Sequence, residues 1–397
     1  MMPPETEQAT PAAETPKVGL VELALVFLKL GTIAFGGPAA HIAMMEQEFV
    51  ARRAWLTREE FLDRLAAANL IPGPSSTEMA IHIGFLKRGW RGLIVAGCCF
   101  IVPAAIMVTL IAAAYVAYGN LPQLNGILYG LKPVVIAVIV QAFWKLAQSA
   151  IKNPFLAAIA VLAAVGSASS IDNLSVILVA GVLAALPIIC RKARAPKPLL
   201  PAWLFPFHGT VPALALVATA ASVVPVTLWR LFLTFIKIGS VLFGSGYVLL
   251  AFLRADFIVH LGWLNQKQLL DAVAVGQITP GPVFTTATFI GYLVAGVKGA
   301  IVATVAIFLP GFFLVAASGP IIARVRRSAI AGAFLDGVIA GSLALMGLVA
   351  WQLGRQSIVD LLTVFLFIMS FALLVHTRTN TLVIIIAAAV VGWWHGA

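Results

Sequence analysis

Asn69-Leu-Ile-Pro-Gly-Pro-Ser-Ser-Thr-Glu78 decides the fold, and its central tripeptide returns in Gln277-Ile-Thr-Pro-Gly-Pro-Val-Phe-Thr-Thr286. Two prolines around a glycine remove backbone donors and forbid a continuous helix, yet both copies lie in strongly apolar sequence. In hydrocarbon, a broken helix is tolerated only where the freed backbone groups are buried in protein or face a water-filled cavity. Two such breaks at corresponding places indicate the binding site of a membrane transporter.

The composition around these breaks is that of an integral membrane protein. Of the 397 residues, 61% are hydrophobic and only 10% are charged, and the mean hydropathy is +1.03. Several apolar windows exceed the roughly 18 residues needed to cross a bilayer core. The net charge of +11 is scattered between apolar stretches, which is typical of cytoplasmic loops and argues against a nucleic-acid partner. We therefore expect a multi-pass protein whose partner is the lipid bilayer.

No motif predicts a cofactor, a metal ion or a catalytic centre. The three cysteines, Cys98, Cys99 and Cys190, lack ligand spacing. The sequence contains no Gly-x-x-x-x-Gly-Lys-Ser/Thr nucleotide loop, no His-Glu-x-x-His zinc motif and no Gly-x-Ser-x-Gly nucleophile turn. An enzyme is therefore not expected, and an ATP-driven pump would need its motor from a partner.

The two halves of the chain are copies of one another. When Pro72 is aligned with Pro280, residues of many types coincide along the halves. The matched pairs include Lys29 with Lys237, Phe35 with Phe243, Trp55 with Trp263 and Asp63 with Asp271, and after a deletion of one residue Pro103 matches Pro310. Shared composition does not explain matched Trp, Asp, Lys and Pro positions, so this is an internal duplication, a familiar architecture of secondary transporters.

Loop charges predict that the two copies are inverted in the membrane. Near the second motif the equivalent loops hold only Lys267 and Lys298, whereas the first motif has basic residues on both sides. These are Arg52, Arg53, Arg58, Arg64, Lys87, Arg88 and Arg91. Because cytoplasmic loops carry an excess of Lys and Arg, the first set is expected in the cytoplasm and the second outside.

We predict an all-α polytopic membrane protein made of two homologous inverted repeats of about five spans each. Residues 1–19 are expected to be a disordered tail, 20–190 the N-terminal membrane repeat, 191–225 a cytoplasmic or interfacial linker, and 226–397 the C-terminal membrane repeat. First-half spans are expected near 21–35, 92–118, 124–148, 154–170 and 174–190, with a re-entrant element near 61–85. The second half repeats this plan from a span near 230–244 onward, with both termini outside. Tilted full spans remain an alternative to the re-entrant elements.

Each Pro-Gly-Pro motif is predicted to start a helix inside the membrane. Proline suits the first turn of a helix, where its missing donor costs nothing. A helix start directs unpaired N–H groups and the positive end of the helix dipole at its surroundings, which favours an anion. Hydroxyls beside the two starts belong to Ser75, Ser76, Thr77, Thr285 and Thr286. The predicted ligand is therefore a small anion.

Two lysines occupy equivalent positions before the Gly-rich breaks. Lys29 and Lys237 each lie within a predicted span, where a lysine costs roughly 2.5 to 3.5 kcal/mol on insertion scales. They are expected to neutralise the anion or to line its path. The alternative is that they snorkel to the interface or pair with a carboxylate such as Glu78 or Glu46.

The acidic residues near the breaks are not matched between the halves. Glu46 and Glu78 correspond to Arg254 and Thr286, so the two halves differ in electrostatics. A carboxylate beside the cavity would take up a proton as the anion passes, which makes Glu78 and Glu46 candidates for proton coupling. The alternative for Glu46 is a place at the cytoplasmic interface.

These arguments define a candidate substrate site without a catalytic or metal-binding residue. It combines the two lysines, the two Gly-rich breaks, the two Pro-Gly-Pro motifs and the hydroxyls that follow them. Its residues are Lys29, Gly36, Gly37, Pro72, Gly73, Pro74, Ser75, Ser76, Thr77, Lys237, Gly244, Ser245, Gly246, Pro280, Gly281, Pro282, Thr285 and Thr286.

Four segments carry the motifs of a known family: Phe35-Gly-Gly-Pro-Ala-Ala-His41, Asn69-Leu-Ile-Pro-Gly-Pro-Ser75, Phe243-Gly-Ser-Gly246 and Ile278-Thr-Pro-Gly-Pro282. They resemble the chromate ion transporter family, in its long form of two fused homologous domains, over essentially the whole chain after the tail. The resemblance implies an inner-membrane transporter that exports chromate, gives chromate resistance and is driven by the membrane potential or the proton gradient. It also implies sulfate as a competing oxyanion.

The second half departs from the first at one of these motifs. Ser245-Gly246 stands where the first half has Gly37-Pro38, so the two Gly-rich breaks are not expected to contribute equally. A transporter of sulfate or another oxyanion, an anion channel, and a membrane protein without transport of its own remain alternatives. A homodimer also remains open.

Overall fold

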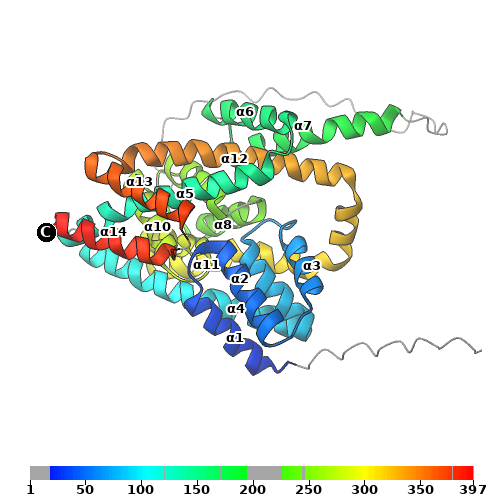
Figure 1. Ribbon diagram of the computed structural model, residues 1–397, viewed down its shortest axis with the longest axis horizontal. Coiled ribbons are helices and arrows are strands. Elements are labelled where there is room, and N and C mark those ends of the chain that lie inside the picture. The colour runs from blue at the N-terminus through cyan, green and yellow to red at the C-terminus, as the bar shows by residue number, and fades with distance from the viewer. Residues whose placement is uncertain are drawn as a thin grey trace, which may run out of the picture.

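The computed structural model describes residues 18–119, 121–169, 171–194, 225–243, 246–377 and 379–396, and all regular structure within these ranges is helical (Figure 1). Residues 1–17, 195–224 and 244–245 lie outside the described ranges. Most of the expected tail and of the expected linker is therefore not described, and neither are the predicted site residues Gly244 and Ser245.

The same order of elements occurs twice. The first half contains α1 (Leu20–Ile33), α2 (Gly37–Glu46), the π-helix η1 (Gln47–Arg52), α3 (Arg58–Ala68), α4 (Ser75–Tyr118), α5 (Pro122–Ala150), α6 (Pro154–Ala168) and α7 (Asn173–Arg194). The second half contains α8 (Leu228–Val241), η3 (Gly246–Val248), α9 (Leu249–Leu253), the π-helix η4 (Arg254–His260), α10 (Gln266–Ile278), η5 (Val283–Thr285), α11 (Thr286–Arg327), α12 (Ala329–Ser357), α13 (Leu361–His376) and α14 (Thr381–Gly396). The predicted all-α fold with two repeats is confirmed.

The helix lengths show which of the predicted spans are long enough to cross a membrane. Among the described residues, α4, α5, α7, α11 and α12 are long and apolar enough to cross a membrane, and α6, α13 and α14 are shorter apolar helices. The spans predicted near 21–35 and 230–244 correspond to α1 and α8, which have 14 residues each. Such a helix is only about 21 Å long, less than the roughly 30 Å of a bilayer core, so α1 and α8 are partial crossings.

Helix α4 turns back on itself at a glycine. Gly89 adopts a φ of +57° inside α4, and a Cβ added to Gly84 would lie 2.3 Å from the carbonyl oxygen of Gly92. In a continuous helix Gly84 and Gly92 would be about 12 Å apart. The chain therefore forms a hairpin with a short arm (residues 75–88) and a long arm (residues 90–118).

The second half repeats this hairpin at Gly296, which has a φ of +59°. Gly291 and Gly299 touch there in the same way, because a Cβ on Gly291 would lie 2.3 Å from the Gly299 carbonyl oxygen. In each half, the helix before Pro-Gly-Pro and the short arm after it form the broken element that the sequence predicts.

The long arms of α4 and α11 show how the repeats are related. Residues 90–102 of α4 line one apolar groove with residues 304–313 of α11, and residues 102–110 line the next groove with residues 300–305. One numbering rises as the other falls, so the two equivalent arms are antiparallel. This is the relation expected of an inverted repeat, whose two-fold axis lies perpendicular to the spanning helices.

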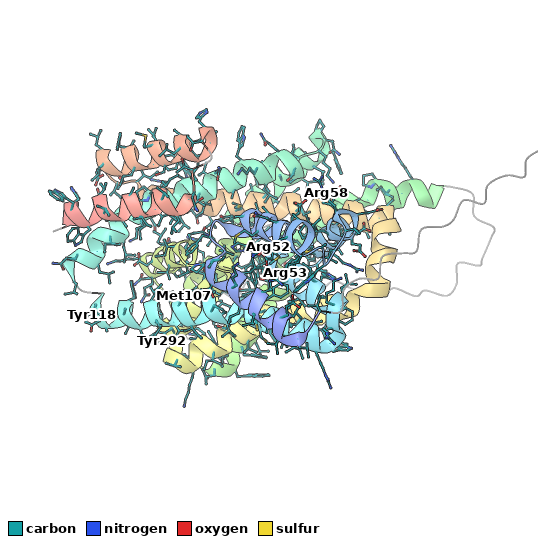
Figure 2. All side chains as sticks on the ribbon, turned by 60° about the horizontal axis from the view of Figure 1, so that its bottom comes forward. Arg52, Arg53, Arg58, Met107, Tyr118 and Tyr292 are labelled. Atoms are coloured by element: carbon teal, nitrogen blue, oxygen red, sulfur yellow. The ribbon has the colours of Figure 1, made fainter. Side chains whose placement is uncertain are left out.

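The antiparallel relation of α4 and α11 can also be followed in Figure 2. Tyr118, at the end of α4, and Tyr292, beside the α11 turn, lie toward one end of the molecule. Arg52 and Arg53, at the end of η1, lie farther along it. The far end of one long helix therefore shares its side of the molecule with the hairpin turn of the other.

The two halves interlock through their later helices. Helix α5 packs against α13 and α14, and its counterpart α12 packs against α6 and α7 (Figure 1). Close backbone approach makes this possible, because a Cβ on Gly130 would lie 2.2 Å from the Ala388 carbonyl oxygen, and one on Gly337 would lie 2.3 Å from that of Ala180. Each half is therefore completed by helices of the other.

Candidate functional site

The two Pro-Gly-Pro motifs cross over to the opposite halves. The backbone N–H of Gly73 donates to the carbonyl oxygen of Leu242 at 2.6 Å, and that of Gly281 donates to the carbonyl oxygen of Ala34 at 2.8 Å. Ala34 and Leu242 are the C-caps of α1 and α8. The last carbonyls of a helix have no partner within it, so each motif satisfies a helix end of the other half.

Both glycines of these motifs need their freedom of backbone conformation. Gly73 has a φ of +133° and Gly281 a φ of +89°, a region that costs residues with a Cβ roughly 1–3 kcal/mol. A Cβ on Gly281 would also lie 2.6 Å from the Cβ of Ala104 in the long arm of α4. Only glycine fits between the second motif and the first half.

Helix α4 begins inside the protein, directly after Pro74, which is its N-cap. Ser76 and Thr77 in its first turn are 1% exposed, and the Thr77 hydroxyl has no hydrogen-bond partner within the described ranges. The N–H groups of Thr77 and Glu78 bond back to the Pro74 carbonyl oxygen at 2.7 and 3.2 Å. The positive end of the helix dipole is thus buried here beside an unsatisfied hydroxyl.

The Glu78 carboxylate lies over this helix start. Its side chain is fully buried, and neither carboxylate oxygen has a hydrogen-bond partner among the described residues. A Cβ on Gly73 would lie 2.0 Å from Glu78 Oε1, and one on Gly311 of α11 would lie 3.7 Å from it. The carboxylate therefore occupies the space between the first Pro-Gly-Pro loop and the second half. It resembles an oxyanion, since it has a negative charge and oxygen acceptors.

His41 connects this helix start to the end of α1. Its Nε2 lies 3.0 Å from the Ala34 carbonyl oxygen and its Nδ1 lies 3.3 Å from Ser76 Oγ. A carbonyl only accepts, so Nε2 carries the proton, and Nδ1 of the neutral ring accepts from the Ser76 hydroxyl. The Ala34 carbonyl thus receives both His41 and Gly281, one from each half.

The second helix start is built differently. The turn η5 precedes α11, and the hydroxyls of Thr285 and Thr286 donate to the carbonyl oxygens of Pro282 and Val283, both at 2.8 Å. These two hydroxyls are therefore engaged within the turn. Thr286 also stands in the position of Glu78, so no carboxylate covers this start.

The Gly-rich break of the first half, at Gly36 and Gly37, also lies close to the second half. Gly36, the N-cap of α2, has a φ of +98° and Gly37 a φ of +78°. A Cβ on Gly37 would lie 3.4 Å from the Tyr247 hydroxyl, which follows Gly246 in η3. The Tyr247 hydroxyl donates to Gln277 Oε1 at 3.4 Å, so the first break and the sequence before the second Pro-Gly-Pro share one neighbour.

The two predicted lysines lie beside the π-helices. Lys237 forms an ion pair with Asp256 of η4, a residue that is 5% exposed, and His260 Nδ1 lies 3.5 Å from the same carboxylate. Lys29 lines a pocket of about 440 Å³ together with Glu48 of η1 and other residues of α1, α2 and η1. No Pro-Gly-Pro residue lines this pocket, so the structure does not bring Lys29 to the helix starts.

The first half holds its acidic residues in a basic cluster. Glu48, the counterpart of Asp256, accepts from Arg53 Nε at 2.7 Å and from Arg52 at 3.2 Å, and Glu46 lies 3.5 Å from Arg58 Nε. Figure 2 shows Arg52, Arg53 and Arg58 gathered in one region. Glu46 is therefore part of a partly exposed charge cluster, whereas Glu78 is buried and alone.

Sequence reasoning missed a buried charge cluster that joins the halves. Asp271 of α10 is fully buried, 3.0 Å from the Lys132 ammonium of α5, and accepts a hydrogen bond of 2.8 Å from the Tyr115 hydroxyl of α4. The match of Asp271 with Asp63 across the repeats was the available signal, because a duplicated acidic residue in apolar sequence demands a reason.

The arrangement at the first helix start favours an anion through the helix dipole. Within the described ranges no group of three His, Cys, Asp or Glu side chains is placed to hold a metal ion. Among the described residues, the two halves together form a buried helix start beside an unpartnered carboxylate.

Comparison with known proteins identifies the family. A family model described as Chromate transporter matches residues 21–186 and 229–393. The chain belongs to this family. The two matched segments are the two repeats, so the chromate transporter model describes one repeat and occurs twice here. The resemblance drawn from the motifs is confirmed.

Three relatives in this family match over most of the chain. A chromate transport protein of Cupriavidus metallidurans is 34% identical over 98% of this chain and 96% of its own length. A probable chromate transport protein of Synechococcus elongatus is 33% identical over 88% of both chains. A chromate transport protein of Pseudomonas aeruginosa is 29% identical over 98% of this chain and 96% of its own length. No solved structure matches the chain.

Proposed function

We propose that this chain is a secondary active transporter that exports chromate across the inner membrane and so gives chromate resistance. Relatives that match nearly the whole chain are named chromate transport proteins. The protein is a multi-pass membrane protein of two inverted repeats, an architecture that secondary transporters use. Sulfate is the competing substrate, since it is a tetrahedral dianion like chromate.

The observation that carries the proposal is the position of Glu78. Its carboxylate is buried without a hydrogen-bond partner, over Gly73 and at the start of α4. A carboxylate buried in this way is costly, and uptake of a proton removes the cost. In the proposed mechanism Glu78 takes up a proton as the anion binds at this place.

Protonation of Glu78 couples binding of the anion to uptake of a proton. Ionised Glu78 places a negative charge beside the α4 start, which repels a dianion. Protonated Glu78 leaves the start free, so the oxyanion binds to the Thr77 hydroxyl and to the helix dipole. Release of the proton on the other side of the membrane then expels the anion. Proton and anion thus cross together with a net negative charge, and export follows because the inside-negative membrane potential drives this charge out of the cell.

The paired hydrogen bonds from Gly73 and Gly281 join the two halves, which supports a site between them. A rocking motion of one half against the other would expose it to each side in turn, as in other transporters with inverted repeats. Lys29 and Lys237 lie on the π-helix side of this site, where they attract the anion toward the path.

The test is chromate flux in inverted vesicles that contain the full chain, measured with and without excess sulfate and with the proton gradient collapsed. Saturable uptake that sulfate inhibits and an uncoupler abolishes is the expected result. Sulfate flux without chromate flux would replace chromate by sulfate as substrate. Flux that neither saturates nor depends on the gradient would indicate an anion channel instead, and no flux of either anion would overturn the proposal.

A further inference from the structure

A second polar pocket lies between helices of the two halves, and no residue of the Pro-Gly-Pro motifs lines it. Its volume is about 280 Å³, and it is enclosed by the end of α6, the start of α7, the π-helix η4 and the middle of α12. Its polar lining residues are Ser167, Asp172, Asn173, Arg254, His260 and Gln352. We call it the Arg254 pocket.

Arg254 is a cation without a partner. Its Nε is buried and makes no hydrogen bond, and no carboxylate lies within 4 Å of the guanidinium among the described residues. A guanidinium stays charged at every pH at which proteins fold. Leaving a buried donor of a charged group unsatisfied is unfavourable, and an acceptor that enters the pocket removes this cost.

The carboxylates nearby are already engaged. Asp172, which lines the pocket, accepts the N–H groups of Leu174 and Ser175 at 3.1 and 3.2 Å and so caps α7. Asp256, two residues after Arg254, pairs through Oδ1 with Lys237 and His260. Neither carboxylate forms an ion pair with Arg254 among the described residues, so the guanidinium is left to an acceptor that enters the pocket.

Gln352 provides a second unsatisfied group in this pocket. Its side-chain oxygen is buried and has no hydrogen-bond partner in the part of the chain that the structure describes. The oxygen and nitrogen of an amide are assigned from their partners, so a half-turn of the amide directs its NH₂ group to an acceptor in the pocket. A tetrahedral oxyanion satisfies both Arg254 and Gln352, and the pocket has the volume of roughly nine waters, enough for an ion of five heavy atoms.

The inverted repeat relates this pocket to a differently charged pocket in the first half. The pocket of Lys29 in the first half is lined by Gln47, Ala51 and Arg52, whose counterparts Ala255, Val259 and His260 line the Arg254 pocket. The counterpart of Arg254, however, is Glu46, which lies beside Arg58. Because the repeats are inverted, equivalent pockets open toward opposite sides, and the second one has an arginine where the first half has Glu46.

We propose that the Arg254 pocket is a second oxyanion site, which holds chromate or sulfate where the path opens beside the α6–α7 connection. The identity of the anion rests on the proposed function. Binding at the pocket itself rests on Arg254, Gln352 and the cavity that they share.

The test reports from the pocket itself. Val259 lines the pocket and is 60% exposed, so Val259→Cys, in a full chain whose Cys98, Cys99 and Cys190 are replaced by alanine, places a thiol at its mouth. The rate of labelling is measured with an anionic and with a cationic methanethiosulfonate reagent, with and without sulfate. The expected result is faster labelling by the anionic reagent and protection by sulfate.

Variants of Arg254 and a control variant test whether the anion preference and the sulfate protection depend on Arg254. Arg254→Gln should remove the preference for the anionic reagent and raise the sulfate concentration needed for protection at least about tenfold, while Arg254→Lys should retain part of both. Arg355→Gln is the matched control, because Arg355 lies one turn after Gln352, is exposed and does not line the pocket. Protection by sulfate that persists in Arg254→Gln, or that is absent from the parent, would overturn the proposal.

Flux in the same vesicles separates this inference from the proposed function. Chromate flux without sulfate protection of the thiol overturns the second site alone. Arg254-dependent protection without flux of either anion overturns the transport function and leaves the oxyanion site in place.

Discussion

The backbone N–H of Gly281 donates a hydrogen bond to the carbonyl oxygen of Ala34 at 2.8 Å. This bond joins the Pro-Gly-Pro motif of the second half to the end of the first helix of the chain, and Gly73 repeats it with Leu242 at 2.6 Å. Each helix break thus supplies the donor that the other half lacks. A site at the breaks belongs to both halves at once.

We expect Gly281→Ala to destabilise the protein by about 1–3 kcal/mol, because the new Cβ meets a positive φ and a crowded backbone. It would lie 2.6 Å from the Cβ of Ala104. Thermal unfolding in detergent measures the change. Gly332→Ala is the control, because Gly332 lies in α12 with nothing within 4 Å of an added Cβ, and it should unfold at the parental temperature or slightly above it. Equal unfolding temperatures for both variants would contradict the close packing of Gly281 against the first half.

Glu78→Gln should uncouple chromate flux from the pH gradient. The amide has nearly the shape of the carboxyl group but neither takes up nor releases a proton, so the coupling of proton uptake to anion binding is lost. Flux in vesicles is measured with and without an imposed pH gradient. Glu59→Gln, a change at an exposed carboxylate in the first turn of α3, should retain the gradient dependence. A Glu78→Gln protein that still responds fully to the gradient would exclude Glu78 as the coupling group and leave Glu46→Gln as the next test.

The two equivalent lysines should respond differently to the same substitution. Lys237→Met leaves the buried Asp256 without its cation and should cost about 1–3 kcal/mol of stability, whereas Lys29 has no ion pair among the described residues and Lys29→Met should leave stability unchanged. Addition of Asp256→Asn to Lys237→Met should restore part of the loss. Unfolding temperatures of the three variants test this, and a larger loss for Lys29→Met would be the opposite of the expected order.

The inverted repeat predicts that the hairpin turns face opposite sides of the membrane. Arg91 follows the turn at Gly89, and Lys298 follows the turn at Gly296. In a chain without its native cysteines, Arg91→Cys and Lys298→Cys should be labelled by a membrane-impermeant thiol reagent from different sides. Labelling of both from one side of sealed vesicles would rule out the inversion.

Glu48 should make stability depend on pH. Burial raises the pKa of its carboxyl group, but hydrogen bonds and charges from Arg53 and Arg52 outweigh burial, and the pKa is lowered from 4.5. A pKa that is lower in the folded state stabilises the protein above the unfolded value, and this contribution is lost as the pH falls through the folded value. Glu48→Gln should therefore lower the unfolding temperature at pH 7, with a difference that disappears in acid below pH 4.5. A difference that is constant over this range would show that the charge of Glu48 is not responsible.

The repeat made most of the architecture predictable. Matched residues such as Lys29 and Lys237 revealed the duplication, the loop arginines indicated inversion, and the paired prolines located the breaks. These signals are local in the sequence or repeat within it. The exact extent of α1 and α8 was not predictable, because apolar sequence alone does not distinguish a partial crossing from a complete one.

The contacts between the halves could not be read from the sequence. Nothing near Lys237 in the sequence indicates Asp256 rather than Glu78 as its partner, and nothing near Asp271 indicates Lys132. Such pairs depend on the π-helices and on the crossing of the repeats, which bring together residues far apart in the chain. The Glu46 and Arg254 mismatch was visible in the sequence, but the cavity beside Arg254 was not.

The packing of α5 against α14 bears on how the protein is made. Helix α5 leaves the ribosome early, while α14 is the last helix of the chain, so the first half inserts into the bilayer with one face still lacking its permanent neighbour. Contacts between such distant segments form slowly, because a long loop must close first. The nascent first half must therefore wait in a partly assembled state, dependent on lipid or on the insertion machinery, until synthesis of the second half is complete.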